Sequence, residues 1–322
     1  MTNVLVTGAS GFIGKPLIAR LLQSGYFVRA ASRSKPLINI IKNTDNYEWQ
    51  YYDLTSIDIN YDSLLKDIDI VIHLAAQVHI MDGISGDILD GYRIVNTRAT
   101  EILADESSSR GIKRFIFLST IKVNGEGSNN RVMSVTDIPN PQDPYAVSKH
   151  DAEIAIRKIG DEGEMDYAIL RPPLVYGPGV RANFLRLLKI ISLRYPLPLA
   201  AINNRRSLIY VYNLVDLIFS FIKLETTVKK VYLVKDIDIS TPDLLRAIAR
   251  SFGHHITLIP VPLFLLKIAG LILGKKSIID RLTDSLVIDD SPTRDELDWA
   301  PLYGLDEGLK ATANWYKEYH LK

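Results

Sequence analysis

The stretch Asn3–Gly14, NVLVTGASGFIG, constrains the fold of this chain more than any other. An apolar run is followed by Gly8, Gly11 and Gly14, and then by apolar residues at helical spacing, which predicts a strand, a tight turn and a helix. Glycines let the backbone approach a ligand closely, and the helix N-terminus offers free N–H groups. The stretch therefore predicts a site for the pyrophosphate of a dinucleotide; the alternative is a glycine-rich turn that is packed for structural reasons alone.

Five further apolar segments are predicted strands, at residues 26–33, 47–52, 69–74, 114–120 and 166–171. Helices are expected at 87–109 and 141–158. Strands that alternate with helices predict right-handed βαβ units, and hence an α/β fold with a doubly wound parallel sheet. Ligands of such sheets bind at the carboxyl ends of the strands.

The alternation ends after Arg171, at a loop rich in proline and glycine. Residues 183–193 are predicted to be helical, whereas 207–211 and 230–234 are β-like and could return to the sheet. From Ser240 onward the pattern is mostly helical. We expect an NAD(P)-binding domain over 1–175, with a returning segment at about 206–235, and a smaller, mostly helical substrate lobe built from 176–205 and 236–322.

Composition excludes several classes of function. Of the 322 residues, 47% are hydrophobic and 23% charged, as in ordinary soluble domains. A net charge of +1 without a dense basic run argues against nucleic-acid binding. The chain has no cysteine and no paired histidines at helical spacing, so we expect no metal. The first strand begins near residue 3, which leaves no room for a signal peptide and favours a cytoplasmic location.

Residues 262–274 form an apolar stretch that contains Lys267. It is shorter than the roughly 20 residues that a membrane-spanning helix needs. We interpret it as a buried helix or a helix of the second lobe; the alternative is a weak contact with a membrane surface or a second copy of the chain.

The end of the second strand bears on the choice of cofactor. An acidic residue there would hydrogen-bond the ribose of NAD, whereas arginine suits the 2′-phosphate of NADP. The sequence has Ser32 and Arg33 and no acid, which favours NADP over NAD. Other candidate contacts lie at the strand ends, and two of them have structural alternatives: Asp53 as a helix cap and Asn96 as a brace for the fourth strand. The predicted cofactor-binding residues are Gly8, Ser10, Gly11, Phe12, Ile13, Gly14, Ser32, Arg33, Asp53, Leu54, Ala75, Ala76 and Asn96.

Tyr145 and Lys149 are four residues apart and share one face of a predicted helix. A phenol titrates near pH 10, and a neighbouring ammonium is expected to lower that pKa. Tyr145 then becomes a candidate acid or base for the interconversion of a hydroxyl and a carbonyl, and Lys149 could also hold the nicotinamide ribose. A hydroxyl at the end of the fifth strand, Ser119 or Thr120, can bind the same oxygen.

These motifs together resemble the extended short-chain dehydrogenases/reductases, in particular the NAD-dependent epimerase/dehydratase family. The resemblance rests on TGASGFIG, on Leu118-Ser-Thr120, on the Tyr145/Lys149 pair, and on 171–178, 206–216 and 290–299. It implies a Rossmann-type fold, a catalytic triad of Thr120, Tyr145 and Lys149, and a UDP-sugar substrate. It also implies that Tyr145 and Lys149 contact the cofactor, and that the backbone near Pro172 and Val175 meets the nicotinamide amide.

The resemblance extends to the substrate lobe. It implies that Asn183 reaches the diphosphate or the sugar, that Leu197 and Leu199 lie against uracil, and that two arginines clamp the diphosphate, because guanidinium forks suit phosphate oxygens. His79 and Lys122 are candidates for lining the sugar site. Asn124 replaces a tyrosine that is usual in the family, which alters the sugar side. The predicted substrate-binding residues are Thr120, Lys122, Asn124, Asn183, Leu197, Leu199, Arg206 and Arg281.

Departures from the family pattern narrow the reaction. The 4,6-dehydratases carry Asp-Glu after the threonine of the fifth strand, whereas this chain has Ile121-Lys122, so dehydratase activity is rejected. The motifs most resemble a branch from bacterial polysaccharide loci, including O-antigen clusters. We expect NAD(P)H-dependent reduction of a UDP-4-keto-6-deoxy-N-acetylhexosamine, as in UDP-N-acetylquinovosamine formation. The alternative is 4-epimerisation of UDP-glucose or UDP-N-acetylglucosamine with tightly bound NAD; a more remote one is a non-catalytic NADP-binding sensor or scaffold. A homodimer through the helices at 87–109 and 141–158 is also expected.

Overall fold

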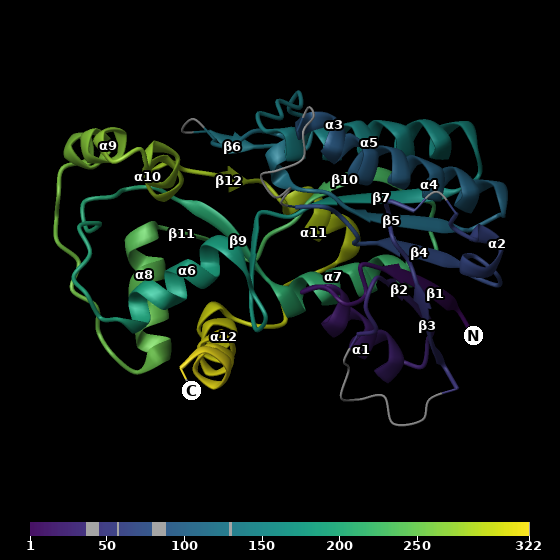
Figure 1. Cartoon of the computed structure of the whole chain (residues 1–322), viewed down its shortest axis with the longest axis horizontal. Coiled ribbons are helices and arrows are strands. Elements are labelled where there is room, and N and C mark those ends of the chain that lie inside the picture. Colours follow the sequence, from purple (N-terminus) through teal and green to yellow (C-terminus); the bar gives the residue numbers. More distant parts are fainter. Residues whose placement is uncertain (37–44, 57, 79–87, 129–130, 322) are drawn as a thin grey trace.

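A seven-stranded parallel sheet forms the centre of the chain, in a computed structural model that describes residues 1–36, 45–56, 58–78, 88–128 and 131–321. Its strand order is β10-β7-β5-β4-β1-β2-β3, and every neighbouring pair is parallel (Figure 1). The order reverses between β1 and β4, as in the Rossmann-type fold. The predicted fold class is therefore confirmed. The strands are β1 (Asn3–Thr7), β2 (Phe27–Ser32), β3 (Tyr47–Tyr51), β4 (Ile70–His73), β5 (Arg114–Leu118), β7 (Asp166–Arg171) and β10 (Lys229–Leu233).

Side chains alternate along each strand, so both faces of the sheet carry apolar residues. Helices cover both faces and bury them. Val4 and Val6 of β1 pack in one cluster with α1 (Gly14–Gln23) and α7 (Val211–Lys223). Leu5 packs in a second cluster, with α4 (Ala99–Ser109) and α5 (Pro144–Glu162) on the opposite face. Figure 1 shows α1 and α7 below the sheet and α4 and α5 above it. These two layers leave the carboxyl ends of the strands accessible for a ligand.

The second lobe has a hydrophobic core of its own, with a three-stranded sheet in the order β11-β9-β8. The β-like segment at 207–211 was expected to return to the main sheet, and this expectation is wrong. It forms β9, which pairs with β8 and β11, whereas β10 occupies the edge of the main sheet beside β7. The remaining elements are α2 (Tyr61–Leu64), β6 (Val132–Met133), β8 (Leu174–Tyr176), α6 (Ala182–Ser192), β9 (Arg206–Tyr210), β11 (Ile237–Ile239), α8 (Thr241–Phe252), α9 (Leu263–Ile272), α10 (Lys276–Thr283), β12 (Val287–Ile288), α11 (Ser291–Leu297) and α12 (Leu305–His320).

Two predicted helices differ from the structure in detail. The segment predicted as one helix over 87–109 contains α3 (Ile88–Tyr92), a π-helical stretch (Arg93–Arg98) and α4. The helix predicted from residue 141 begins at Pro144, because the Asp143 carboxylate accepts a hydrogen bond from Ala146 N at 2.7 Å and caps it. Within the described ranges no helix is both long and apolar enough to cross a membrane.

Candidate active site

The glycine turn after β1 is tightly packed against its neighbours. Gly8 has a φ of 67°, and a Cβ there would lie 2.7 Å from the backbone nitrogen of Ala75. A Cβ at Gly14 would lie 2.4 Å from the carbonyl oxygen of Gly8. Helix α1 starts at Gly14 without a side chain that caps its first turn. The N–H groups of this turn therefore suit an anion such as a pyrophosphate, and Ser10, Gly11, Phe12 and Ile13 are the residues that would hold it.

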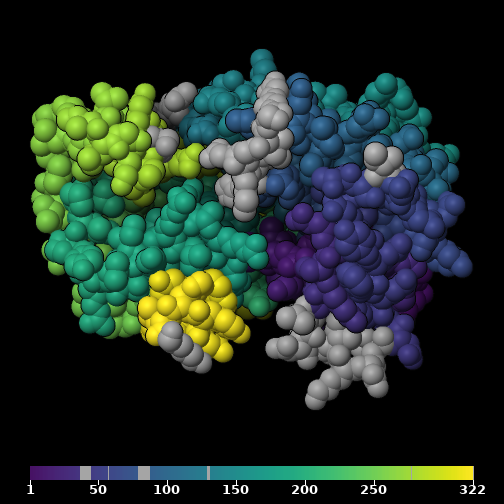
Figure 2. Space-filling model, in the orientation of Figure 1, coloured from purple at the N-terminus to yellow at the C-terminus, as the bar shows by residue number. Residues whose placement is uncertain are grey.

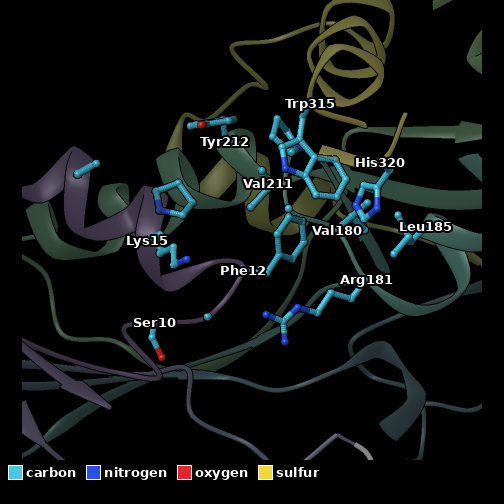
Figure 3. A pocket seen from close by; sticks show the side chains of 15 residues that line it. Ser10, Phe12, Lys15, Val180, Arg181, Leu185, Val211, Tyr212, Trp315 and His320 are labelled. Carbon is cyan, nitrogen blue, oxygen red and sulfur yellow. The ribbon is translucent and has the colours of Figure 1, made fainter. Parts of the chain in front are cut away.

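A cavity of about 790 Å³ lies against this turn (Figure 3). Figure 3 shows Phe12 facing the cavity, with Trp315 and His320 of α12 beside it and Arg181 of the second lobe below. Neither Tyr145 nor Lys149 lines it. The cavity therefore adjoins the dinucleotide turn and lies away from the candidate chemistry.

Thr120 lies just beyond β5, which ends at Leu118. Its position is set by backbone hydrogen bonds on both sides: Ser119 N donates to Leu170 O at 2.7 Å, and Ile121 N donates to Pro172 O at 3.0 Å. Thr120 Oγ1 accepts a hydrogen bond from Lys122 N at 3.3 Å. The ends of β5 and β7 are thus joined, and they bring Thr120 close to Pro172 and the segment that carries Val175.

Lys149 is fully enclosed between α5 and the sheet, with its Nζ 3.8 Å from the centre of the Phe117 ring. Burial lowers the pKa of Lys149 to about 7, although the Glu153 carboxylate opposes this shift. Lys149 can therefore gain or lose a proton near neutral pH, which an exposed lysine cannot do.

Tyr145 precedes Lys149 by one turn of α5 and stands 6.1 Å from the Tyr92 ring, centre to centre. Burial raises the pKa of Tyr145, and the Asp143 carboxylate and Tyr92 raise it further. The expectation that Lys149 lowers this pKa is therefore not met in this structure. The reason is that burial in the protein disfavours the charged phenolate.

A buried ion pair that was not predicted from the sequence lies one turn beyond Lys149 along α5. Glu153, one turn after Lys149, pairs with Arg171 of β7, and the Arg171 Nε lies 3.0 Å from Glu153 Oε1. Ser119 Oγ also donates to Glu153, and His150 Nδ1 lies 4.0 Å from it. The spacing of four places Glu153 on the same face of α5 as Lys149, but it does not identify Arg171 as the partner. This cluster ties α5, β5 and β7 together beneath the candidate triad.

Several polar side chains at the strand ends are engaged within the protein. Asn96, in the π-helical stretch, accepts from Gln77 N at 2.8 Å and donates to Gln77 O and Ser148 Oγ, both at 3.0 Å. It braces the segment after β4, which was the alternative role foreseen for it. Asn124 donates to Ser134 O and accepts from Arg171, so both ends of its amide are occupied.

The predicted adenosine side is arranged around the ends of β2 and β3. Ser32 Oγ is buried and donates to Ser34 O at 2.7 Å, whereas Arg33 is exposed. Asp53 accepts from Thr55 N at 3.0 Å, and this hydrogen bond is the largest cause that holds its pKa below the usual range. The Asp53 carboxylate therefore closes a turn. It does not cap helix α2, as the alternative for it proposed, because Asn60 caps that helix. Leu54 packs against the core, and Ala75 and Ala76, just past β4, are half-buried.

His73 at the end of β4 is a buried polar residue that sequence reasoning did not assign. Its Nδ1 lies 2.7 Å from Thr7 Oγ1, its Nε2 lies 2.9 Å from Thr100 Oγ1, and its ring stacks on Phe117. Burial lowers the pKa of His73 to about 3, and the charge of Lys149 adds to this effect. A neutral His73 therefore links β1, β4 and α4 under the predicted nicotinamide side.

The predicted substrate residues fall into two groups. Asn183 and Arg281 are exposed, and Arg206 is partly exposed beside Arg281. The Arg206 guanidinium donates to the carbonyl oxygens of Arg281 and Asp284, each at 3.0 Å. Burial lowers the pKa of Arg206. The others are more enclosed or already paired: Leu199 is buried in the second core, Leu197 forms a β-bridge with Leu258, and Lys122 pairs with Glu126 at 3.0 Å and with Asp143. His79 lies outside the described residues.

A sequence model described as the NAD dependent epimerase/dehydratase family matches residues 4–234, more than half of the chain. The chain belongs to this family. The resemblance inferred from the motifs is thus confirmed. UDP-glucose 4-epimerase of Vibrio cholerae is 38% identical over 315 residues, which are 97% of this chain and 94% of the relative. The dTDP-D-glucose 4,6-dehydratase of Bos taurus is 27% identical and covers 98% of this chain and 89% of its own length.

Solved structures share the fold along nearly the whole chain. MoeE5 in complex with UDP-glucuronic acid and NAD is 26% identical, with a TM-score of 0.77 over 98% of this chain and 99% of its own. UDP-glucuronic acid 4-epimerase from Bacillus cereus, in complex with UDP-glucuronic acid and NAD, has a TM-score of 0.78 at 22% identity, over 99% of this chain and 100% of its own.

The 206–216 and 290–299 motifs meet where the chain after α11 packs against α7. Trp299 Nε1 donates to Asp216 Oδ2 at 3.0 Å, and Arg294 pairs with Asp290 at 2.6 Å. Asn213 Oδ1 accepts from Tyr303 N at 2.9 Å. In this epimerase/dehydratase family member these hydrogen bonds therefore hold α7 against the segment that follows α11.

Proposed function

We propose that the chain is a UDP-hexose 4-epimerase that uses NAD and acts on an N-acetylated hexose for cell-surface polysaccharide synthesis in the cytoplasm. The observation that carries the proposal is the 38% identity to a UDP-glucose 4-epimerase over nearly the full length of both chains. The intact set of Thr120, Tyr145 and Lys149 at the carboxyl ends of the strands supports it. Our first expectation from the sequence alone, 4-keto reduction, thereby becomes the second candidate.

The residues of this chain have distinct tasks in the proposed reaction. A bound nicotinamide would supply the chemistry of hydride transfer from C4 of the sugar and back to its opposite face. Tyr145 takes the proton from the C4 hydroxyl as that hydride leaves, and it gives a proton back at the end. Thr120 would hydrogen-bond the same oxygen, and Lys149, one turn further along α5, would hold the nicotinamide ribose. Arg206 and Arg281 would hold the diphosphate.

The second candidate, reduction of a UDP-4-keto-6-deoxy-N-acetylhexosamine with NAD(P)H, is supported by the end of β2. Ser32 and Arg33 follow Ala31, and no acidic residue stands there to bind the ribose hydroxyls of NAD. A reductase releases its oxidised cofactor after each turnover and does not need to retain it. The same three catalytic residues would serve both reactions, so they do not distinguish the two.

The deciding experiment uses purified protein without added cofactor. Incubation with UDP-N-acetylglucosamine, and separately with UDP-glucose, should yield the galacto isomer, detected by chromatography of the UDP-sugars. Conversion supports an epimerase with retained cofactor. The other outcome is that neither substrate is converted and that NAD(P)H absorbance falls in proportion to an added UDP-4-keto-6-deoxy sugar. That outcome contradicts the epimerase and supports the reductase.

Arg33→Asp tests which dinucleotide the end of β2 prefers. We expect the affinity for NADPH to fall at least about tenfold, because a carboxylate replaces the exposed guanidinium next to the predicted 2′-phosphate position. Binding is measured by fluorescence titration with NADPH and NADH. Lys35→Asp, an equal charge change at a nearby exposed residue, is the control. An unchanged NADPH affinity in Arg33→Asp contradicts the 2′-phosphate argument.

We also propose a homodimer through the outer faces of α4 and α5. Ile102 of α4 is 39% exposed and Ile154 of α5 is 52% exposed, although isoleucine is usually buried. Ile154→Glu should shift the mass measured by light scattering from two chains to one, because it places a charge in the proposed interface. Ile190→Glu on α6 is the matched control, and a wild-type protein with the mass of one chain contradicts the dimer.

A further inference from the structure

Helix α9 is apolar on nearly every side and yet largely exposed. Its ten residues include one charged residue, Lys267, and its only buried residues are Leu266 and Gly270. Phe264 is 61% exposed, Leu271 68% and Ile272 78%. A helix that is hydrophobic all round is normally buried, and exposed patches of this kind mark interaction sites. This stretch was predicted to be a buried helix or a helix of the second lobe; the helix belongs to the lobe but is not buried.

The helix is held as part of a hairpin at one end of the molecule. A Cβ at Gly270 would lie 2.6 Å from Ile279 Cγ1, so α9 packs closely on α10 through this glycine. Figure 2 shows the light-green residues of this region at the upper left corner, remote from the nucleotide-binding sheet on the right. Ile259 and Ile278, 45% and 46% exposed, extend the apolar surface on either side. We call residues 259–279 the apolar hairpin.

Positive charge accompanies this surface. The sequence contains no aspartate or glutamate between Asp243 and Asp280. Lys275 and Lys276 are exposed where α9 passes into α10. Lys267 is about half exposed, and its Nζ lies 3.8 Å from Asp284 Oδ1. The hairpin is thus apolar at its centre and cationic around it.

We propose that the apolar hairpin docks on the surface of an anionic lipid bilayer. Its side chains would enter the boundary between headgroups and acyl chains, and its lysines would meet the headgroup phosphates. Successive helix residues are turned by about 100°, so the exposed residues Leu263, Phe264 and Leu265 point in three different directions. A second protein covers one face of a helix, whereas lipid surrounds a protruding helix on all sides, which is why we favour lipid.

The position of the hairpin ties docking to the substrate lobe. Helix α10 ends near Arg281, whose carbonyl oxygen accepts a hydrogen bond from Arg206 at 3.0 Å. A docked hairpin would hold these two arginines close to the membrane surface. The docking itself does not depend on the proposed reaction, because it can be measured without a sugar substrate.

The test is co-sedimentation of the full chain with vesicles. We expect it to bind vesicles of equal parts phosphatidylcholine and phosphatidylglycerol, and to bind phosphatidylcholine alone at least about tenfold more weakly. Leu271→Glu/Ile272→Glu should reduce binding to the mixed vesicles at least about tenfold, since it places charges in the acyl boundary. Ile138→Glu/Leu302→Glu, at residues 87% and 62% exposed elsewhere, is the matched control and should bind as the wild type does.

Other outcomes would overturn the proposal. Absence of wild-type binding does so, as does equal binding to both vesicle types or an equal loss in the control variant. A wild-type oligomer that Leu271→Glu/Ile272→Glu dissociates, without vesicle binding, would assign the hairpin to a second copy of the chain. If the double variant does not fold, Phe264→Trp replaces it: its fluorescence should shift to the blue with the mixed vesicles, and an unchanged spectrum contradicts docking.

Discussion

Tyr145→Phe should lower turnover of the UDP-sugar by about 10²–10⁴-fold, the range that a general acid–base group contributes. In the proposed reaction the phenol exchanges a proton with the C4 oxygen, and its removal would leave Thr120 and Lys149 unable to replace it. The ring itself remains and keeps its contact with Tyr92. The affinity for the dinucleotide should therefore stay near that of the wild type. Both effects are measured on one preparation, by sugar conversion and by cofactor titration.

Tyr92→Phe is the matched control, because it removes the hydroxyl from the neighbouring ring. That hydroxyl donates to Val78 O at 3.1 Å, and the variant should keep most of the activity. Full activity of Tyr145→Phe would remove the proposed mechanism. No turnover by the wild type on any UDP-sugar, with the dinucleotide still bound, would favour a sensor or scaffold.

Glu153→Ala should lower the free energy of unfolding by about 3–5 kcal/mol, because it leaves Arg171 buried without its partner. Both side chains are 3% exposed or less, so little water can take the place of the carboxylate. The loss is measured by urea unfolding near pH 7. Asp151 lies on the same helix as Glu153, and its partly exposed ion pair joins it to Arg93 of the π-helical stretch. We expect Asp151→Ala to cost about 1 kcal/mol or less. Equal costs for the two variants would contradict the role of the buried pair.

The pH dependence offers a second measurement on the same variant. Burial alone would raise the pKa of Glu153, but its polar neighbours, His150 and Arg171 foremost, hold that pKa below the usual range. The ionised carboxylate therefore stabilises the fold above the ordinary pKa of glutamate, and this contribution is lost as the pH falls through the lowered value. The difference between wild type and Glu153→Ala should shrink in acid. Glu153→Gln, which keeps an acceptor for Ser119, should show an intermediate loss.

Local features of the sequence determined the order of the elements and the candidate chemistry. Gly8 and Gly14 indicate the turn in the sequence, because only a residue without a Cβ fits so close to the backbones of Ala75 and Gly8. Tyr145 and Lys149 fall on one helix because four residues make about one turn. Alternation of strands and helices predicts a parallel sheet because its connections are short and right-handed. Each of these predictions depends only on residues that are close together in the sequence.

Only the tertiary structure decided the features that depend on what packs against a residue. Glu153 and Arg171 meet because α5 lies over β7, and nothing in the spacing of 18 residues indicates a buried pair. Burial reverses the expected shift of the Tyr145 pKa, since desolvation depends on the whole environment. The β-like segment at 207–211 joins β8 because β10 takes the sheet edge. The apolar α9 is exposed because its neighbours cover only Leu266 and Gly270, which the hydropathy of the stretch does not reveal.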